Sequence, residues 1–336
     1  MKHRFILISF IVIAVGIMFI GRNKTYSRDI YGTFDTLCSI SIHSASDTTE
    51  QYEKLLRELD RELNAHTSDS LVGRLNSGET VSLTPQMTDF LCTAVSYTNM
   101  LSNYFDITVN PIVESWAKSE ENSALPDDIP QKLKLTGADC IHIDIDNNTA
   151  QIKEDGASIT LGAIAKGYAA NVIADKMRQD GISSGLVNLG GNIYALGSKP
   201  DGSEWNIAIS DPANSAQAAV TVKCSDKAVV TSGDYERYFE LNGNRYHHII
   251  DPKTGYPSES GLNSVTVIDR DAELCDVLST ALFVAGLDEA KKIIEKLSVD
   301  AILIENNNIY YTDGLTNKLQ LNNEKFTLIP LNQNNL

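Results

Sequence analysis

The sequence lacks paired cysteines, and this absence excludes several kinds of site. Its 336 residues contain five cysteines, and none of them forms a C-x-x-C pair. Zinc sites, iron–sulfur clusters and the disulfide frameworks of small secreted domains need closely spaced cysteines. A chain of this length buries a self-sufficient core. We therefore expect small buried thiols, with a single disulfide as an alternative, at Cys38, Cys92, Cys140, Cys224 and Cys275.

Positive charge is also scarce. The chain has 28 Lys and Arg against 44 Asp and Glu, a formal net charge of −16. This balance argues against a nucleic-acid partner or an anionic membrane surface. The phosphate-binding spacings G-x-x-x-x-G-K-[ST] and G-x-G-x-x-G are missing as well. An anionic ligand would therefore need locally concentrated basic side chains or a bound cation.

Only the N-terminus carries a long uncharged hydrophobic run. "MKHR" precedes "FILISFIVIAVGIMFI" at residues 5–20, and Gly21-Arg22-Asn23-Lys24 follows. A basic start before an uninterrupted apolar run is typical of an export signal. We expect residues 1–24 to be an uncleaved signal-anchor in the cell membrane, with the body on the extracytoplasmic side. A cleaved signal is the alternative.

Residues 25–330 show neither a Pro/Ser-rich linker nor a repeat, and strand-like and helix-like patterns alternate along them. We therefore expect one interleaved α+β body with mixed and antiparallel sheets and flanking helices. The patterns predict a strand over 29–43, helices over 48–64, from Pro85 onward, over 163–180, over 271–286 and over 288–297, and hairpins turning at Asn147–Asn148 and Asn242–Gly243.

Two glycine-containing segments are candidates for ligand binding. In "LGAIAKGYAA", Lys166 falls in the first turn of a predicted helix, where the helix dipole disfavours a cation. An anion at this helix start would reverse that penalty, whereas a solvated lysine is the alternative. In "LVNLGGN", Gly190 and Gly191 allow close approach of a ligand or form a tight turn, and alone they favour the turn.

Asp276 and Thr280 lie four residues apart on a predicted helix and so share one face. A carboxylate and a hydroxyl beside main-chain carbonyls at a helix end provide hard oxygen ligands suited to Mg²⁺. The alternative is a polar pair on an otherwise buried helix.

The segment "TSGDYERYFELNGNRYHHIIDPKTGYP", Thr231 to Pro257, combines polar side chains with turn formers. We expect one turn at Ser232–Gly233–Asp234 and another over Asp251–Gly255. Adjacent His247 and His248 point to opposite faces of a strand, which argues against a shared zinc ion.

Together these segments resemble the successive motifs of the ApbE family, the FAD:protein FMN transferases. The resemblance runs from about Asp29 to about residue 320. Departures are Tyr31, where the family often has Met, and Asn192, where Asp is frequent. The motifs that carry it are, in order, "YGTFDTLCSI", "YFDITVNPIV", "LGAIAKGYAANVIADKM", "GLVNLGGNIYALG", "TSGDYERYF", "YHHIIDPKTGYP" and "CDVLSTALFVAG".

The resemblance implies a T-fold-related body that binds FAD and Mg²⁺. It implies metal ligands at the side chains of Asp276 and Thr280 and the carbonyls of Ala163 and Ser279, with Lys166 at the FAD pyrophosphate. His248 would deprotonate or orient the acceptor hydroxyl, or only bind FAD. Lys166 and His248 are thus the catalytic candidates. The implied FAD-binding set is Asn76, Thr108, Lys166, Asn188, Gly190, Gly191, Ser232, Gly233, Asp234, Tyr235, His248, Asp251 and Thr254.

The implied reaction transfers the FMN moiety of FAD to a Thr or Ser hydroxyl of a target flavoprotein and releases AMP. The expected acceptor is a subunit of an extracytoplasmic electron-transfer or ion-pumping complex. Two alternatives use the same residues: an Mg²⁺-dependent FAD pyrophosphatase that yields FMN and AMP, and a non-catalytic exported protein that binds FAD. Nucleic acid is not an expected partner.

Overall fold

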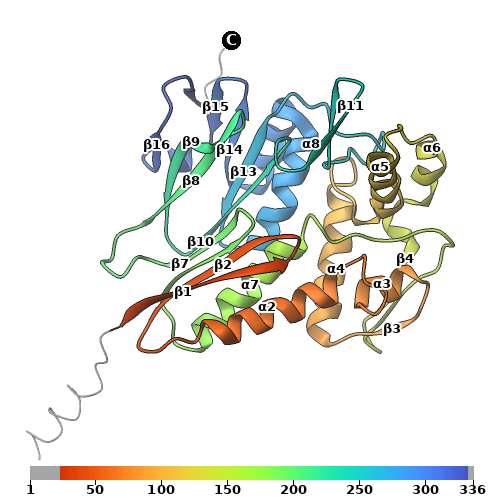
Figure 1. Cartoon of the computed structure of the whole chain (residues 1–336), viewed down its shortest axis with the longest axis horizontal. Coiled ribbons are helices and arrows are strands. Elements are labelled where there is room, and N and C mark those ends of the chain that lie inside the picture. Colours follow the sequence, from red (N-terminus) through yellow and green to blue (C-terminus); the bar gives the residue numbers. More distant parts are fainter. Residues whose placement is uncertain (1–22, 332–336) are drawn as a thin grey trace, which may run out of the picture.

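A nine-stranded sheet forms the centre of the protein, seen here in a computed structural model that describes residues 23–331 (Figure 1). All neighbouring strands are antiparallel except the last pair. The strand order is β1 (Lys24–Thr33), β2 (Thr36–Ser44), β6 (Ser184–Leu189), β7 (Asn192–Gly197), β10 (Lys227–Gly233), β13 (Ser264–Asp269), β14 (Asp300–Glu305), β15 (Asn308–Tyr311) and β17 (Thr327–Pro330).

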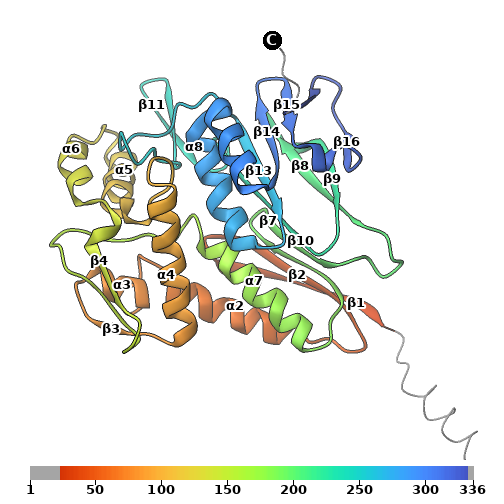
Figure 2. The same cartoon turned by 180° about the vertical axis from the view of Figure 1, so that it is seen from behind.

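Two different layers cover this sheet. Helices α2 (Thr49–Leu63), α7 (Ala165–Gln179) and α8 (Ala272–Leu297) pack on one face (Figure 2). A three-stranded sheet of β16 (Leu319–Leu321), β9 (Asn214–Cys224) and β8 (Trp205–Asp211) packs on the other. Strand β10 shows the expected alternation, because Ala228 and Val230 join the helix-side core whereas Val229 joins the core under β8 and β9.

A largely helical part is inserted between β2 and β6, which are neighbours in the sheet (Figure 1). This insertion explains the interleaved pattern of the sequence. Its elements are α3 (Leu71–Asn76), β3 (Val81–Ser82), α4 (Pro85–Met100), η1 (Ile107–Val109), α5 (Asn110–Asn122), α6 (Ile129–Lys132), η2 (Leu133–Leu135), η3 (Ala138–Cys140), β4 (Ile141–Asp144) and β5 (Thr149–Ile152). The remaining elements are the hairpin β11 (Tyr238–Leu241) and β12 (Asn244–His247), and η4 (Asp313–Leu315).

Several predicted elements are confirmed. Helix α2 agrees with the helix predicted over 48–64, and Thr84 caps α4 by accepting a hydrogen bond from the N–H of Met87. The hairpins turn at Asn147–Asn148 and Asn242–Gly243. The two helices predicted over 271–297 are the halves of α8, separated where Gly286 leaves the helical conformation.

Two predicted elements are wrong. The single strand expected over 29–43 is a hairpin, because Phe34 and Asp35 both adopt positive φ and reverse the chain between β1 and β2. The turn expected at Ser232–Gly233–Asp234 begins later, since Ser232 and Gly233 extend β10 and pair with β13. In the first case the apolar alternation continues across the turn and hides it, and in the second the Ser-Gly-Asp composition suggested a turn two residues too early.

The predicted signal or anchor segment, residues 1–24, lies outside the described residues except for its last two positions, and Lys24 already begins β1. Within residues 23–331, no helix is long and apolar enough to cross a membrane.

Candidate active site

The start of α7 is pressed against the first half of α8. A Cβ atom on Gly167 would lie 2.3 Å from the carbonyl oxygen of Ala272, so only glycine permits this approach. The contact brings the N–H of Gly167 within 2.9 Å of Asp276 Oδ2, to which it donates a hydrogen bond. The N-terminus of α7, with its positive dipole end, therefore points at the Asp276 carboxylate.

Asp276 is the buried acidic group of this site, with 4% of its surface exposed. Its Oδ1 accepts a hydrogen bond from Asn192 Nδ2 at 2.8 Å, and Lys166 Nζ lies 3.9 Å from the same oxygen. Lys166 Nζ also donates to the carbonyl oxygen of Gly162 at 3.2 Å. The carboxylate is thus fixed by α7 on one side and by β7 on the other, with one ammonium group beside it.

A cluster of hydroxyl groups continues from Asp276 along α8. Ser232 Oγ of β10 lies 2.8 Å from Ser279 Oγ and 3.3 Å from Thr280 Oγ1. Ser279 Oγ donates to the carbonyl oxygen of Asp276 at 2.9 Å. Asp276 and Thr280 both lie inside α8, one helical turn apart, which confirms the shared helix face predicted for them.

These residues suit a hard divalent cation better than a soft one. Among residues 23–331, no group of three His, Cys, Asp or Glu side chains is placed to hold a metal ion. Asp276 and Thr280 instead offer one carboxylate and one hydroxyl a helical turn apart, and Lys166 already places a positive charge beside the same carboxylate. Oxygen ligands of this kind fit Mg²⁺, which completes its shell with water and substrate phosphates.

The two adjacent histidines have different surroundings. His247 Nε2 donates to the carbonyl oxygen of Ser258 at 2.9 Å, and its Nδ1 accepts the N–H of Ile249 at 3.2 Å. Both ring nitrogens of His247 are therefore used within the fold, as expected for a structural residue. This geometry also agrees with the argument against a zinc ion shared by the pair.

His248 has one engaged and one free ring nitrogen. Its Nδ1 lies 3.1 Å from the carbonyl oxygen of Arg237 and must donate to it, because a carbonyl only accepts. Nε2 then carries no proton, and within residues 23–331 it has no hydrogen-bond partner. Burial, together with the charges of Arg237 and Lys166, lowers the pKa of His248, although the residue as a whole is exposed. A neutral ring with a free Nε2 is suited to accept a proton.

The segment that links β10 to β11 adds a second carboxyl group. Partial burial of the carboxyl group raises the pKa of Glu236 to about 7, and the nearby positive charges of Lys166 and Arg237 oppose this shift. The Glu236 side chain is exposed, so water reduces the shift that burial alone would give. The sequence reasoning missed Glu236, Arg237 and Gly167. Arg237 contacts His248 through its main-chain carbonyl, a group that every residue has, so the residue type gave no indication of this role.

The turn after His248 is anchored on the helical insertion. The carbonyl oxygen of Asp251 accepts the N–H groups of Thr254 and Gly255, which confirms the predicted turn. Trp116 of α5 donates its indole N–H to the carbonyl oxygen of Gly255 at 2.8 Å. A Cβ on Gly255 would lie 2.5 Å from Ile129, so this packing requires glycine.

Other predicted FAD-binding residues occupy strand ends and turns around these groups. Gly190 and Gly191 form the turn between β6 and β7, and Asn188 Oδ1 accepts the N–H of Gly191. Tyr235 stacks so closely on Gly233 that a Cβ there would lie 2.5 Å from its ring. Burial raises the pKa of Asp234.

Asn76 and Thr108 lie in the helical insertion and are already engaged. The Asn76 amide bonds through both its oxygen and its nitrogen to the main chain of Ile159. Thr108 Oγ1 donates to Asp106 and accepts the N–H of Gly137. Both side chains therefore hold loops in place.

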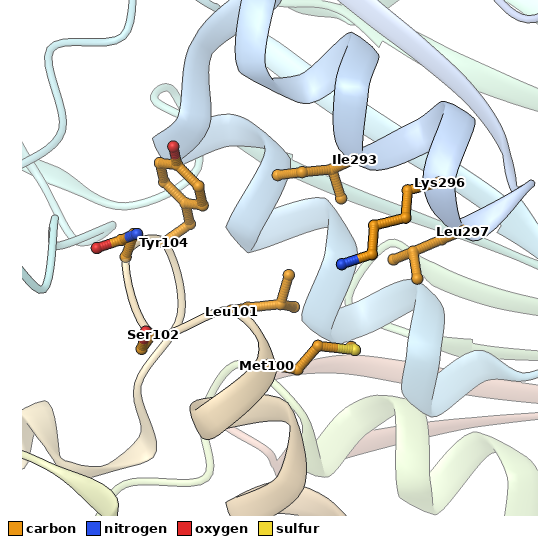
Figure 3. Close-up of a pocket in the computed structure, with 8 residues that line it drawn as sticks. Met100, Leu101, Ser102, Tyr104, Ile293, Lys296 and Leu297 are labelled. Atoms are coloured by element: carbon orange, nitrogen blue, oxygen red, sulfur yellow. The ribbon is translucent and has the colours of Figure 1, made fainter.

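A small hollow of about 110 Å³ lies at the opposite end of α8 from Asp276 (Figure 3). Figure 3 shows Leu101, Tyr104 and Ile293 facing one another around it, with Lys296 at its edge. Its lining is mainly apolar and contains no carboxylate. The chemical groups described above make the start of α7 a better candidate site than this hollow.

Comparisons with known proteins show which family this chain resembles. The model of the ApbE family matches residues 34–303. A Klebsiella pneumoniae protein named FAD:protein FMN transferase is 37% identical over 60% of this chain. The match covers 64% of that relative, so this chain spans slightly less than two thirds of its length. A Treponema pallidum protein of the same name is 31% identical over 91% of this chain and 92% of its own length.

Solved structures show the same fold. The ApbE protein from Thermotoga maritima superposes with a TM-score of 0.77 and 28% identity, over 90% of this chain and 98% of that one. The flavin transferase ApbE from Vibrio cholerae gives a TM-score of 0.76 at 26% identity, over 88% and 99% of the two chains. The α+β fold, with a large mixed sheet and flanking helices, is therefore that of ApbE structures. Because the family model covers most of its length, this chain belongs to the ApbE family.

Proposed function

We propose that this chain is an FAD:protein FMN transferase. It moves the FMN half of FAD onto a Ser or Thr hydroxyl of a flavoprotein and releases AMP. The observation that carries the proposal is the convergence of Asp276, Lys166 and the start of α7, in a chain whose relatives carry that name. Attack on a pyrophosphate needs positioning and charge neutralisation more than covalent catalysis.

The pyrophosphate of FAD would lie at the start of α7. Lys166 and the positive end of the helix dipole supply the positive charge that a chain of net charge −16 otherwise lacks. Asp276 and Thr280, with the carbonyls of Ala163 and Ser279, would hold Mg²⁺ beside it. When bound, Mg²⁺ would neutralise charge on the phosphate oxygens.

His248 would act as the general base. Its free Nε2 takes the proton of the acceptor hydroxyl while the hydroxyl oxygen attacks the phosphorus of the FMN half. A new phosphate ester bond forms to the acceptor, and the bond from that phosphorus to the bridging oxygen breaks, so AMP leaves with the electron pair. The Arg237 carbonyl keeps the proton of neutral His248 on Nδ1 and so preserves the tautomer in which Nε2 can accept a proton.

We also propose a cellular location for the reaction, based on the sequence of the N-terminal segment. Residues 1–24 would anchor the enzyme in the cell membrane with its body on the extracytoplasmic side, where it would meet a subunit of an electron-transfer or ion-pumping complex. The basic and then apolar pattern of residues 1–20 supports this location.

The Mg²⁺-dependent FAD pyrophosphatase is the second candidate, and the exposure of His248 to solvent favours it as a side reaction. The test incubates the full chain with FAD, Mg²⁺ and a flavoprotein acceptor domain, and measures protein mass and AMP. An FMN adduct on the acceptor that is lost with Asp276→Asn supports the proposal. AMP and free FMN without any adduct would replace it with the hydrolase.

A further inference from the structure

The β11–β12 hairpin forms a two-stranded sheet of its own beside the candidate site (Figure 1). In a hairpin with the two-residue turn Asn242–Gly243, the residues that flank the turn exchange main-chain hydrogen bonds, and so does every second pair along the strands. Leu241 therefore bonds to Asn244 and Phe239 to Tyr246, whereas the pairs between them do not bond to each other. The N–H of His248 donates to the carbonyl oxygen of Arg237, which agrees with this register.

The register leaves two main-chain edges free. On β11, the N–H and C=O groups of Tyr238 and Glu240 point away from β12. On β12, those of Arg245 and His247 point away from β11. Within residues 23–331, none of these outward main-chain groups has a hydrogen-bond partner. A free edge of this kind is a template for another strand.

One face of the hairpin packs against the helical insertion. Phe239 and Tyr246 stack on each other and pack against Trp116 of α5. Isolated two-stranded hairpins are marginally stable in water, and this aromatic contact supplies the missing support. The β11 edge begins one residue after Arg237, whose carbonyl holds the ring of His248.

The other face of the hairpin carries groups typical of interfaces. Tyr238 is 44% exposed, and the Arg245 guanidinium lies 4.0 Å from the centre of its ring. In the described part of the chain, neither Arg237 nor Arg245 forms an ion pair, although the protein has an excess of acidic residues. Arg237 donates to the main-chain carbonyl of Asp35 at 3.2 Å, so neither guanidinium is neutralised by a carboxylate. Exposed Tyr and Arg side chains are enriched at protein–protein contacts, and arginines without a carboxylate partner favour an acidic one.

We propose that the β11 edge docks an extended, acidic segment of the acceptor protein as an added strand. This inference rests on the proposed transferase function, because the acceptor hydroxyl must reach the free Nε2 of His248. A strand paired with Tyr238 and Glu240 and continuing past Arg237 brings its next residues to that ring. Main-chain pairing supplies affinity, whereas Tyr238, Arg237 and Arg245 select the side chains of the segment.

Proline at position 240 tests the edge directly. Glu240→Pro removes an outward N–H and leaves the hydrogen bonds between β11 and β12 intact, and proline is tolerated at such edge positions. Glu240→Ala is the control for loss of the side chain. Arg245→Pro, compared with Arg245→Ala, removes an outward N–H from the opposite edge. We expect the KM for the acceptor to be about tenfold higher in Glu240→Pro than in Glu240→Ala, because proline removes one main-chain hydrogen bond between β11 and the docked segment. The two Arg245 variants should differ by less than about twofold, since the β12 edge is not used.

A second measurement uses the unmodified protein and covers the case in which proline disturbs the hairpin. Amide hydrogen exchange is followed with and without the acceptor domain. The proposal expects slower exchange at Tyr238 and Glu240 and unchanged exchange at Arg245 and His247. Unchanged exchange at Tyr238, or equal effects at both edges, would overturn it. Failure of the transferase function itself is distinguishable, because no FMN would then reach the acceptor in any variant.

Discussion

Asp276 and His248 are held by groups that no local sequence pattern reveals. The partners of Asp276 are a main-chain N–H of α7 and the amide of Asn192 on β7. The partner of His248 is the carbonyl of Arg237. Residue chemistry drew attention to Asp276, Lys166 and the two histidines, and the resemblance to the ApbE family selected Asp276, Lys166 and His248 among them. Their partners lie far along the chain or act through the main chain, so they required the fold.

Replacement of His248 by alanine separates its two suggested roles. If His248 is the base, transfer falls about 10²- to 10⁴-fold while FAD affinity changes little. Flavin fluorescence measures binding, and acceptor mass measures transfer. A parallel loss of binding and transfer would show that His248 is only an FAD contact.

Glu273, in the first turn of α8, is a buried acid outside the proposed reaction. Burial and the charges of Asp271 and Asp276 raise its pKa from 4.5 to about 8, and its Oε1 is buried without a hydrogen-bond partner in the described residues. The folded protein therefore keeps this proton between these two pKa values, whereas the unfolded chain releases it.

Stability should consequently fall as pH rises from about 4.5 to about 8, because the folded state binds more protons there. Between these two pKa values, Glu273 should lower the unfolding free energy by up to about 1.4 kcal/mol per pH unit, and above pH 8 its effect on the slope should disappear. Urea unfolding of the wild type and Glu273→Gln, compared at several pH values, measures it. The difference in unfolding free energy between the two should shift in favour of Gln with rising pH, and a constant difference would contradict the assignment.

At the scale of elements, the contact between α7 and α8 builds the site. Helix boundaries, the Thr84 cap and two hairpin turns were predictable, because each depends on nearby residues. The β1–β2 hairpin was not, since Phe34 and Asp35 are unusual at positive φ and the alternation of apolar residues continues across the turn. The close approach at Gly167 was not predictable either, because its neighbour is Ala272, far along the chain.

Gly167→Ala tests this contact. Alanine favours an isolated helix, by about 1 kcal/mol over glycine. Here its Cβ would meet main-chain atoms of Ala272 and Glu273, so we expect a net loss of about 2 kcal/mol in unfolding free energy.

Gly162→Ala is the matched control. The nearest atom to its added Cβ is Thr160 Oγ1 at 3.6 Å, an ordinary contact. Its unfolding free energy should stay within about 0.5 kcal/mol of the wild type in urea titrations. Equal effects of the two substitutions would mean that the helices do not meet closely at Gly167.

At the scale of the whole molecule, an acidic protein places one lysine and the positive end of a helix dipole where an anion would bind. The helical insertion and the large sheet come from alternating parts of the chain, and both contribute to the site. Trp116 anchors the turn after His248, whereas α7 and β7 hold Asp276 and β10 contacts the hydroxyl groups beside it. The alternation of strand-like and helix-like patterns predicted this interleaved α+β arrangement. The position of the insertion beside the site depends on long-range pairing of β2 with β6, which local patterns do not contain.

The ratio of AMP released to FMN bound covalently to the acceptor tests the central claim most directly. With FAD, Mg²⁺ and an acceptor domain, the transferase account predicts a covalent FMN adduct with at least one AMP released for each adduct, and loss of both products when EDTA removes the metal. Release of AMP with free FMN and an unmodified acceptor would contradict it.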